Sequence, residues 1–91
     1  LILKPLIDAY LSGRYADVIK LSAQVPPTQR LRWHMLVLRA AAAFTLAESG
    51  ADDSATAIAR KAVTEARASD ATRKPDPDYF SPRFIAFFQG G

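Results

Sequence analysis

The chain has 91 residues, of which 49% are hydrophobic and 23% are charged, and its net charge is +3 at pH 7. This length allows one domain, and the composition is that of a globular protein rather than a disordered one. Cysteine is absent, which excludes disulfides and thiolate metal sites, and no apolar run approaches the roughly 20 residues of a membrane-spanning helix.

The N-terminal part of the chain predicts a pair of helices, within about 1–25. Apolar residues recur at helical spacing in the segment 1–11, where Pro5 requires the helix to begin close to it. Gly13 breaks the pattern, and a second helix follows over 14–24. A Pro-Pro dipeptide ends this helix because proline cannot donate a backbone hydrogen bond.

The segment 28–68 predicts a second helix pair. Thr28 is a suitable N-cap for a long helix whose apolar residues lie on nearly all sides, which is typical of a buried helix. Gly50 ends it, and an aspartate at position 52 or 53 caps the next helix, over 54–68. The apolar stripe of that helix is mostly small: Ala55, Ile58, Ala59, Ala62, Val63 and Ala66.

The C-terminal part predicts a loop over 69–80 and a short helix over 81–89. The loop is polar and rich in proline, so it cannot continue the preceding helix. Ser81 suits an N-cap, and Pro82 suits the first helical position. The helix is aromatic, and we expect it to cap the core; its exposed rings would also favour self-association.

The two helix pairs resemble tetratricopeptide repeats. The run Ala9-Tyr10-Leu11-Ser12-Gly13-Arg14-Tyr15 is similar to the middle of such a repeat, where aromatic residues flank a glycine turn. The second match is carried by Leu38, Ala42, Phe44, Gly50, either Ala57 or Ala59, Ala62 and Ala66. We describe the chain as tetratricopeptide-like rather than as a strict member. Gly13 and Gly50 are 37 residues apart, whereas the tetratricopeptide repeat has a period of about 34 residues. In addition, Val18 stands where the family usually has alanine.

This resemblance implies an all-α fold. The two antiparallel helix pairs would stack as a tetratricopeptide-like superhelix, or right-handed bundle, and the short C-terminal helix would cap them. The segment from Pro77 to Arg83 resembles one that closes helical-repeat regions in some bacterial envelope proteins. Together with a start at Leu1, this leads us to expect a piece of a larger bacterial protein from the cell envelope, in the periplasm.

Catalysis and metal binding find little support in the sequence. His34 is the single histidine, and its predicted helix offers only Glu48 as a further ligand. The paired aspartates lie at a helix start and in the proline loop, where capping and turn formation explain them. No glycine-rich phosphate loop or nucleophile elbow is present. We therefore expect no enzymatic activity, no cofactor and no metal.

The function that the resemblance implies is recognition of a peptide or partner subunit. Helical-repeat modules bind on the inner face, which is lined by the first helix of each pair. The candidate partner-binding residues on these helices are Lys4, Asp8, Arg32, Trp33 and Arg39. We expect these side chains to face outward, with the arginines able to hold a carboxylate through two hydrogen bonds.

Two other functions stay open at this point. One is a nucleic-acid-binding domain that uses Arg30, Arg32 and Arg39 of the third helix. The basic residues are otherwise spread along the chain, which argues against nucleic acid as the main partner. The other is a scaffold segment that only spaces neighbouring domains and has no ligand.

Overall fold

The computed structural model of the chain describes residues 3–24, 28, 31–50 and 53–90. Within this part of the chain the fold is all-α, as predicted, with no strand. Its helices are α1 (Lys4–Leu11), α2 (Tyr15–Gln24), α3 (Arg32–Glu48), α4 (Ala55–Ser69) and α5 (Pro82–Gly90).

The helix ends follow local signals in the sequence. Gly13 has φ +78° and Gly50 has φ +75°, a backbone conformation that favours glycine, and the two residues separate the helices as predicted. Ser81 caps α5, because its Oγ accepts a hydrogen bond from the Phe84 N–H at 3.2 Å. Pro82 then occupies the first position of α5, where its missing N–H has no helical partner to lose.

The N-cap positions of α3 and α4 differ from the predicted ones. Thr28 caps a turn ahead of α3, since its Oγ1 accepts from the Leu31 N–H at 3.3 Å, and Leu31 itself holds the N-cap position of α3. Ser54, not Asp53, holds the N-cap position of α4. The alternative cap, Asp52, and the Pro-Pro dipeptide lie outside the described residues.

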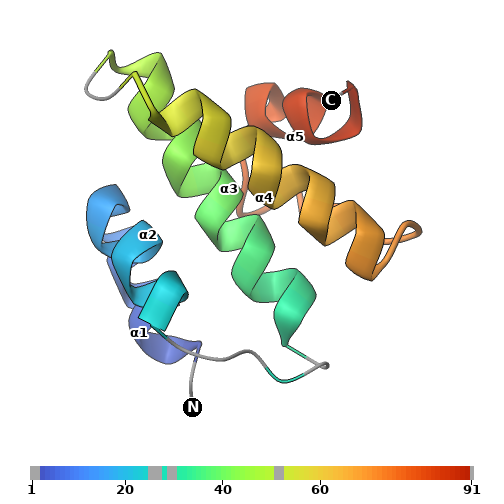
Figure 1. Ribbon diagram of the computed structural model, residues 1–91, viewed down its shortest axis with the longest axis horizontal. Helices are drawn as coiled ribbons and strands as arrows, with labels where there is room; N and C mark the ends of the chain where they lie inside the picture. Colours follow the sequence, from blue (N-terminus) through green and yellow to red (C-terminus); the bar gives the residue numbers. More distant parts are fainter. Residues whose placement is uncertain (1–2, 25–27, 29–30, 51–52, 91) are drawn as a thin grey trace.

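Helix α3 lies in the middle of the molecule (Figure 1). Helix α4 runs antiparallel along it, the hairpin of α1 and α2 covers another side, and α5 lies beyond α4 and α3 (Figure 1). As predicted, α3 buries residues all round its axis: Trp33, Met35, Leu36, Val37, Leu38 and Ala40–Ala43. The long helix therefore forms the centre of the hydrophobic core.

The contact between α3 and α4 is the most extensive between any two helices, and it is built from small side chains. Helix α4 buries Ala55, Ala59, Ala62, Val63 and Ala66, and the buried residues of α3 include four alanines at 40–43. Because the distance between two helix axes depends on the side chains at their contact, this composition lets the two backbones come close. The predicted alanine stripe is thus the seam of the second helix pair.

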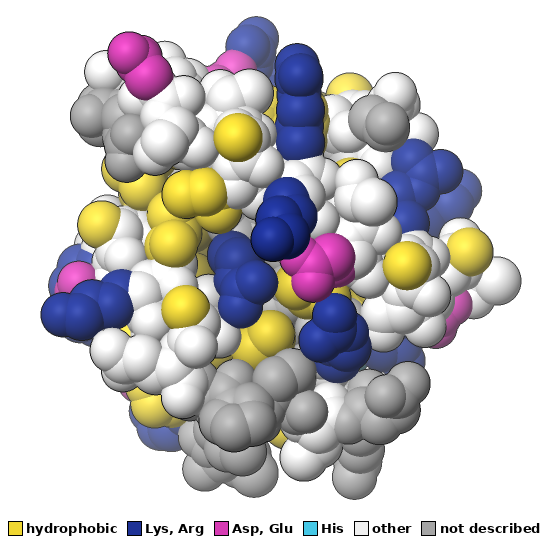
Figure 2. Space-filling view, viewed as in Figure 1, with side chains coloured by type: hydrophobic (Ala, Val, Ile, Leu, Met, Phe, Trp, Pro, Cys, Tyr) yellow, Lys and Arg dark blue, Asp and Glu magenta, His cyan; other side chains and the backbone are white. Residues whose placement is uncertain are grey.

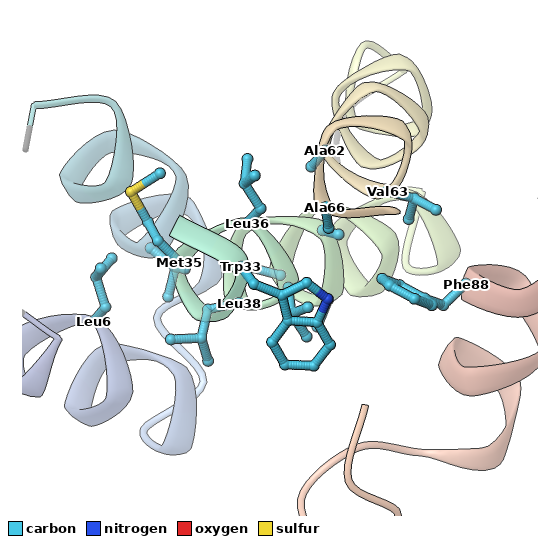
Figure 3. Packing of buried hydrophobic residues seen from close by; sticks show 14 of the residues in the cluster. Leu6, Trp33, Met35, Leu36, Leu38, Ala62, Val63, Ala66 and Phe88 are labelled. Atoms are coloured by element: carbon cyan, nitrogen blue, oxygen red, sulfur yellow. The ribbon is translucent and has the colours of Figure 1, made fainter. Parts of the chain in front are cut away.

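Helix α5 joins the core through large side chains instead. Phe84 is 2% exposed and Phe88 is 3% exposed, and the ring of Phe88 lies 6.3 Å from that of Trp33 (Figure 3). Phe44 of α3 lies 4.9 Å from Phe87. Nη1 of Arg67 also donates to the terminal carbonyls of α5, at 3.3 Å and 3.2 Å. The aromatic helix caps the core, as expected.

Replacing Ala62 by leucine should destabilise the protein, because Ala62 is 1% exposed within the α3–α4 seam and has no space for three more carbons. Overpacking of this kind typically costs about 1–3 kcal/mol. Urea unfolding followed by circular dichroism measures the change. Lys61→Leu puts the same side chain on the exposed side of α4 and should change the free energy of unfolding by less than about 0.5 kcal/mol. Equal stabilities of the two variants would contradict the close packing of Ala62 between α3 and α4.

Candidate functional site

An apolar groove lies between α1, the first half of α3 and the turn that precedes α5. Its volume is about 330 Å³. Helix α1 contributes the side chains of Ile7, Tyr10 and Leu11, while the turn contributes Tyr79 and Phe80. Helix α3 supplies the floor between them, so segments far apart in the sequence build one concavity. Concave, mainly apolar sites of this size are typical of ligand and anchor-residue pockets.

Exposed apolar side chains gather at this groove. In the part of the chain that the structure describes, three large hydrophobic residues are exposed: Ile7 at 41%, Leu11 at 67% and Tyr79 at 68%. All three line the groove. Single exposed hydrophobic residues are common on protein surfaces, but a cluster around a concavity is characteristic of a binding site.

Aromatic contacts hold the groove in shape. The rings of Tyr10 and Phe80 lie 5.6 Å apart and join α1 to the turn. Tyr10 also meets Tyr15 of α2 edge-on at 5.7 Å. Burial raises the pKa of the Tyr10 phenol above its usual value, and Tyr15 adds to the effect, so the wall carries no charge at neutral pH. Rigid aromatic walls of this kind suit an apolar anchor.

The floor of the groove includes Trp33, which is 8% exposed. Its indole lies between α3 and α5, with the ring nitrogen on the side of Phe88 (Figure 3). Among the described residues, this nitrogen is buried without a hydrogen-bond partner, which typically costs about 1–3 kcal/mol. Packing therefore holds the indole in place rather than a hydrogen bond.

The polar edge of the groove is formed by His34 and Arg73. Nη1 of Arg73 donates to Nε2 of His34 at 3.0 Å, which requires a neutral imidazole with its proton on Nδ1. The Arg73 guanidinium also lies 5.4 Å from the centre of the Trp33 ring. Partial burial lowers the pKa of His34 below its usual value, and the charge of Arg73 adds to the effect.

The structure does not bring the five predicted site residues together. Lys4 and Asp8 form an exposed ion pair of 3.0 Å on α1. Arg32 pairs with Glu65 of α4 at 3.2 Å, and Arg39 donates to Oγ and to the carbonyl of Ser22 in α2, at 2.8 Å and 3.0 Å. These two arginines therefore tie α3 to its neighbours.

The positions of Arg32 and Arg39 follow from the helical repeat. The two residues are seven apart in the sequence and share one side of α3, because two turns take about seven residues. His34 and Val37, which line the groove, lie on roughly the opposite side. Of the five predicted residues, only Trp33 lines the groove. The expectation that Trp33 faces outward is wrong, because its ring is packed between α3 and α5.

Sequence reasoning gave no binding role to the groove residues of α1, whereas it predicted that Tyr79 and Phe80, in the aromatic C-terminal cluster, either cap the core or anchor a partner. Leu3, Ile7 and Tyr10 recur at spacings of four and three residues, which marks a second apolar stripe beside the buried Leu6. A helix of eight residues with two apolar stripes must leave one of them at the surface or partnered. Tyr79 lies in a turn, so no helical periodicity marks it.

The opposite face of α3 carries basic side chains. Figure 2 shows Lys and Arg gathered over the middle of the face that α2, α3 and α4 present, around an acidic side chain. Burial lowers the pKa of Arg39, while Glu65 opposes this effect and Arg32 adds to it. The predicted arginines thus belong to a charged surface that is separate from the apolar groove.

Comparisons with known proteins yield no relative. No family model matches the chain, and neither a curated protein nor a solved structure does. Within residues 3–24, 28, 31–50 and 53–90, no three side chains of His, Cys, Asp or Glu are grouped so that they could hold a metal ion. None of the helices in this part of the chain has the length and apolar character that crossing a bilayer needs.

Acidification should destabilise the protein through His34. Because the pKa of His34 is lower in the folded chain than the value of about 6.5 in the unfolded chain, the unfolded chain takes up the proton first. The free energy of unfolding therefore falls as the pH drops through about 6.5 towards the folded pKa. Urea unfolding at pH 7.5 and pH 5.5 measures this loss.

The control for this experiment is His34→Gln, which keeps an acceptor for Arg73 but does not titrate. The variant should lose less stability than the wild type over the same pH interval. A loss as large as that of the wild type would show that His34 is not the group responsible.

Proposed function

We propose that the chain is a non-enzymatic protein–protein interaction module that binds a segment of a partner protein in the apolar groove of α1, α3 and the 79–80 turn. The observation that carries this proposal is the gathering of Ile7, Leu11 and Tyr79 around one concavity. Interface energy concentrates in a few large apolar side chains that fill pockets. A groove of about 330 Å³ suits one or two such side chains.

Residues of α1 and α3 line the groove, and these are the first helices of the two predicted pairs. This position supports recognition of a peptide rather than a purely spacing role. We further propose that the module belongs to a larger bacterial protein of the cell envelope, on the resemblance of the segment from Pro77 to Arg83. Just before that segment, the backbone carbonyl of Asp76 accepts hydrogen bonds from the N–H groups of Tyr79 and Phe80, which turns the chain towards α5.

Nucleic-acid binding has weaker support. Two of the three arginines that would carry it are engaged within the fold, Arg32 with Glu65 and Arg39 with Ser22, while Arg30 lies outside the described residues. Phosphate contacts would have to replace these bonds, and Glu65 would repel the phosphate. The peptide groove is therefore the function that we propose.

Leu11→Glu should abolish most of the binding while the fold remains intact. Selection from a displayed library of random linear peptides provides the probes, and the selected peptides should contain a bulky apolar residue. A charge at position 11 would place an unpaired carboxylate against that residue, so affinity should fall at least about tenfold. Isothermal titration calorimetry measures the affinity, and circular dichroism checks the melting temperature.

The matched control is Lys20→Glu, which introduces the same side chain on the exposed surface of α2 and should leave the affinity within about twofold. Selection that enriches no peptides with bulky apolar residues would contradict the proposal. Equal affinities of wild type and Leu11→Glu would do the same.

A further inference from the structure

Arg73 is a cation fixed at the edge of an otherwise apolar groove. Its guanidinium lies over the ring of Trp33 at 5.4 Å and donates to Nε2 of His34 at 3.0 Å, and both of these residues line the groove. Stacking on an aromatic ring and one hydrogen bond restrict the planar fork to one orientation. Arg73 therefore has less freedom than an ordinary surface arginine.

The charge of Arg73 is poorly neutralised within the fold. Asp70 is its nearest acidic partner, but the distance from Oδ2 to Nε is 3.9 Å, beyond hydrogen-bond reach. The other carboxylate oxygen of Asp70 accepts from the N–H and the hydroxyl of Thr72, at 3.0 Å and 2.7 Å. The hydrogen bonds of the Asp70 carboxylate thus go to Thr72 in its own turn. Within the described residues, Nη2 of Arg73 has no hydrogen-bond partner.

Some other cations of the described chain hydrogen-bond directly to a carboxylate. Lys4 bonds to Asp8 at 3.0 Å, Arg32 bonds to Glu65, and Arg83 bonds to Glu48. By contrast, the hydrogen bond of Arg73 goes to the neutral imidazole of His34. The second hydrogen of Nη1 and both hydrogens of Nη2 form a fork of donors, which matches the two oxygens of a carboxylate.

We propose that the groove recognises a bulky apolar residue accompanied by an Asp or Glu side chain within one or two positions, and that Arg73 binds this carboxylate. The inference rests on the proposed function, because the apolar residue is the anchor that fills the groove. The carboxylate would take two hydrogen bonds from Arg73 beside an apolar surface, where such bonds are stronger than in water. The partner is thus an acidic, amphipathic protein segment.

Two pools of synthetic nine-residue peptides test this inference. Both have an acetylated N-terminus, an amidated C-terminus and a central Leu or Phe. One pool carries Glu at the flanking positions, and the other carries Gln. Fluorescence anisotropy measures their affinities for the wild type. The Glu pool should bind about tenfold more tightly, and the preference should shrink in high salt.

Arg73→Gln should remove the preference and leave the two pools equal. Arg14→Gln is the control, because Arg14 is an exposed arginine of another ion pair and does not line the groove. Arg73→Lys keeps the charge but lacks the planar fork, so it should retain part of the preference. This variant also keeps the test valid if Arg73→Gln lowers the melting temperature by uncovering Trp33.

The outcomes separate the two proposals. Equal binding of both pools to the wild type would overturn the role of the carboxylate and leave the apolar groove standing. A preference for Glu that survives in both Arg73 variants would overturn the assignment to Arg73. Failure of both pools to bind would contradict the proposed function together with this inference.

Discussion

The burial of α3 on nearly all of its sides is the constraint on which the rest of the structure depends. Its buried residues face α1 and α2 on one side, α4 on another and α5 on a third. A helix with this composition would be insoluble alone, so each neighbouring element has to cover part of it. The groove exists where this cover is incomplete, between α1 and the turn that leads into α5.

Side-chain size explains why α3 has close neighbours on one side and a groove on another. Alanines on both helices bring α4 near to α3, which leaves no room for a ligand between them. Helix α5 approaches α3 through phenylalanines, such as Phe84 and Phe87 against Phe44, and their bulk keeps the backbones apart. Tyr10 and Phe80 bridge part of this gap, and the remaining concavity is lined by aromatic and aliphatic side chains.

Much of the fold can be predicted from the sequence because the residues that begin and end its helices act locally. Gly13, Gly50 and the Ser81-Pro82 pair act within one turn of the backbone, and α2, α4 and α5 begin and end within one residue of the predicted limits. The start of α3 was harder to predict, because Thr28 caps a separate turn before the helix. Local capping patterns do not reveal whether the helix continues from the first turn.

The candidate site was harder to predict, because it depends on which side of each helix meets which neighbour. Periodicity places Arg32 and Arg39 on the same side of α3, but only the packed fold shows that this side faces Ser22 and Glu65. Arg73 lies in a loop, and its contact with Trp33 joins residues 40 positions apart. Such long-range contacts leave no pattern in a single sequence.

Hydrogen exchange of the backbone amides under native conditions tests the central role of α3 most directly. If α3 is the element that the others cover, the amides from Leu36 to Ala43 should exchange only when the whole domain unfolds. Their protection should then match the free energy of unfolding measured with urea, and exceed the protection of α1 and α5. Exchange of these α3 amides as fast as that of α1 would contradict the account.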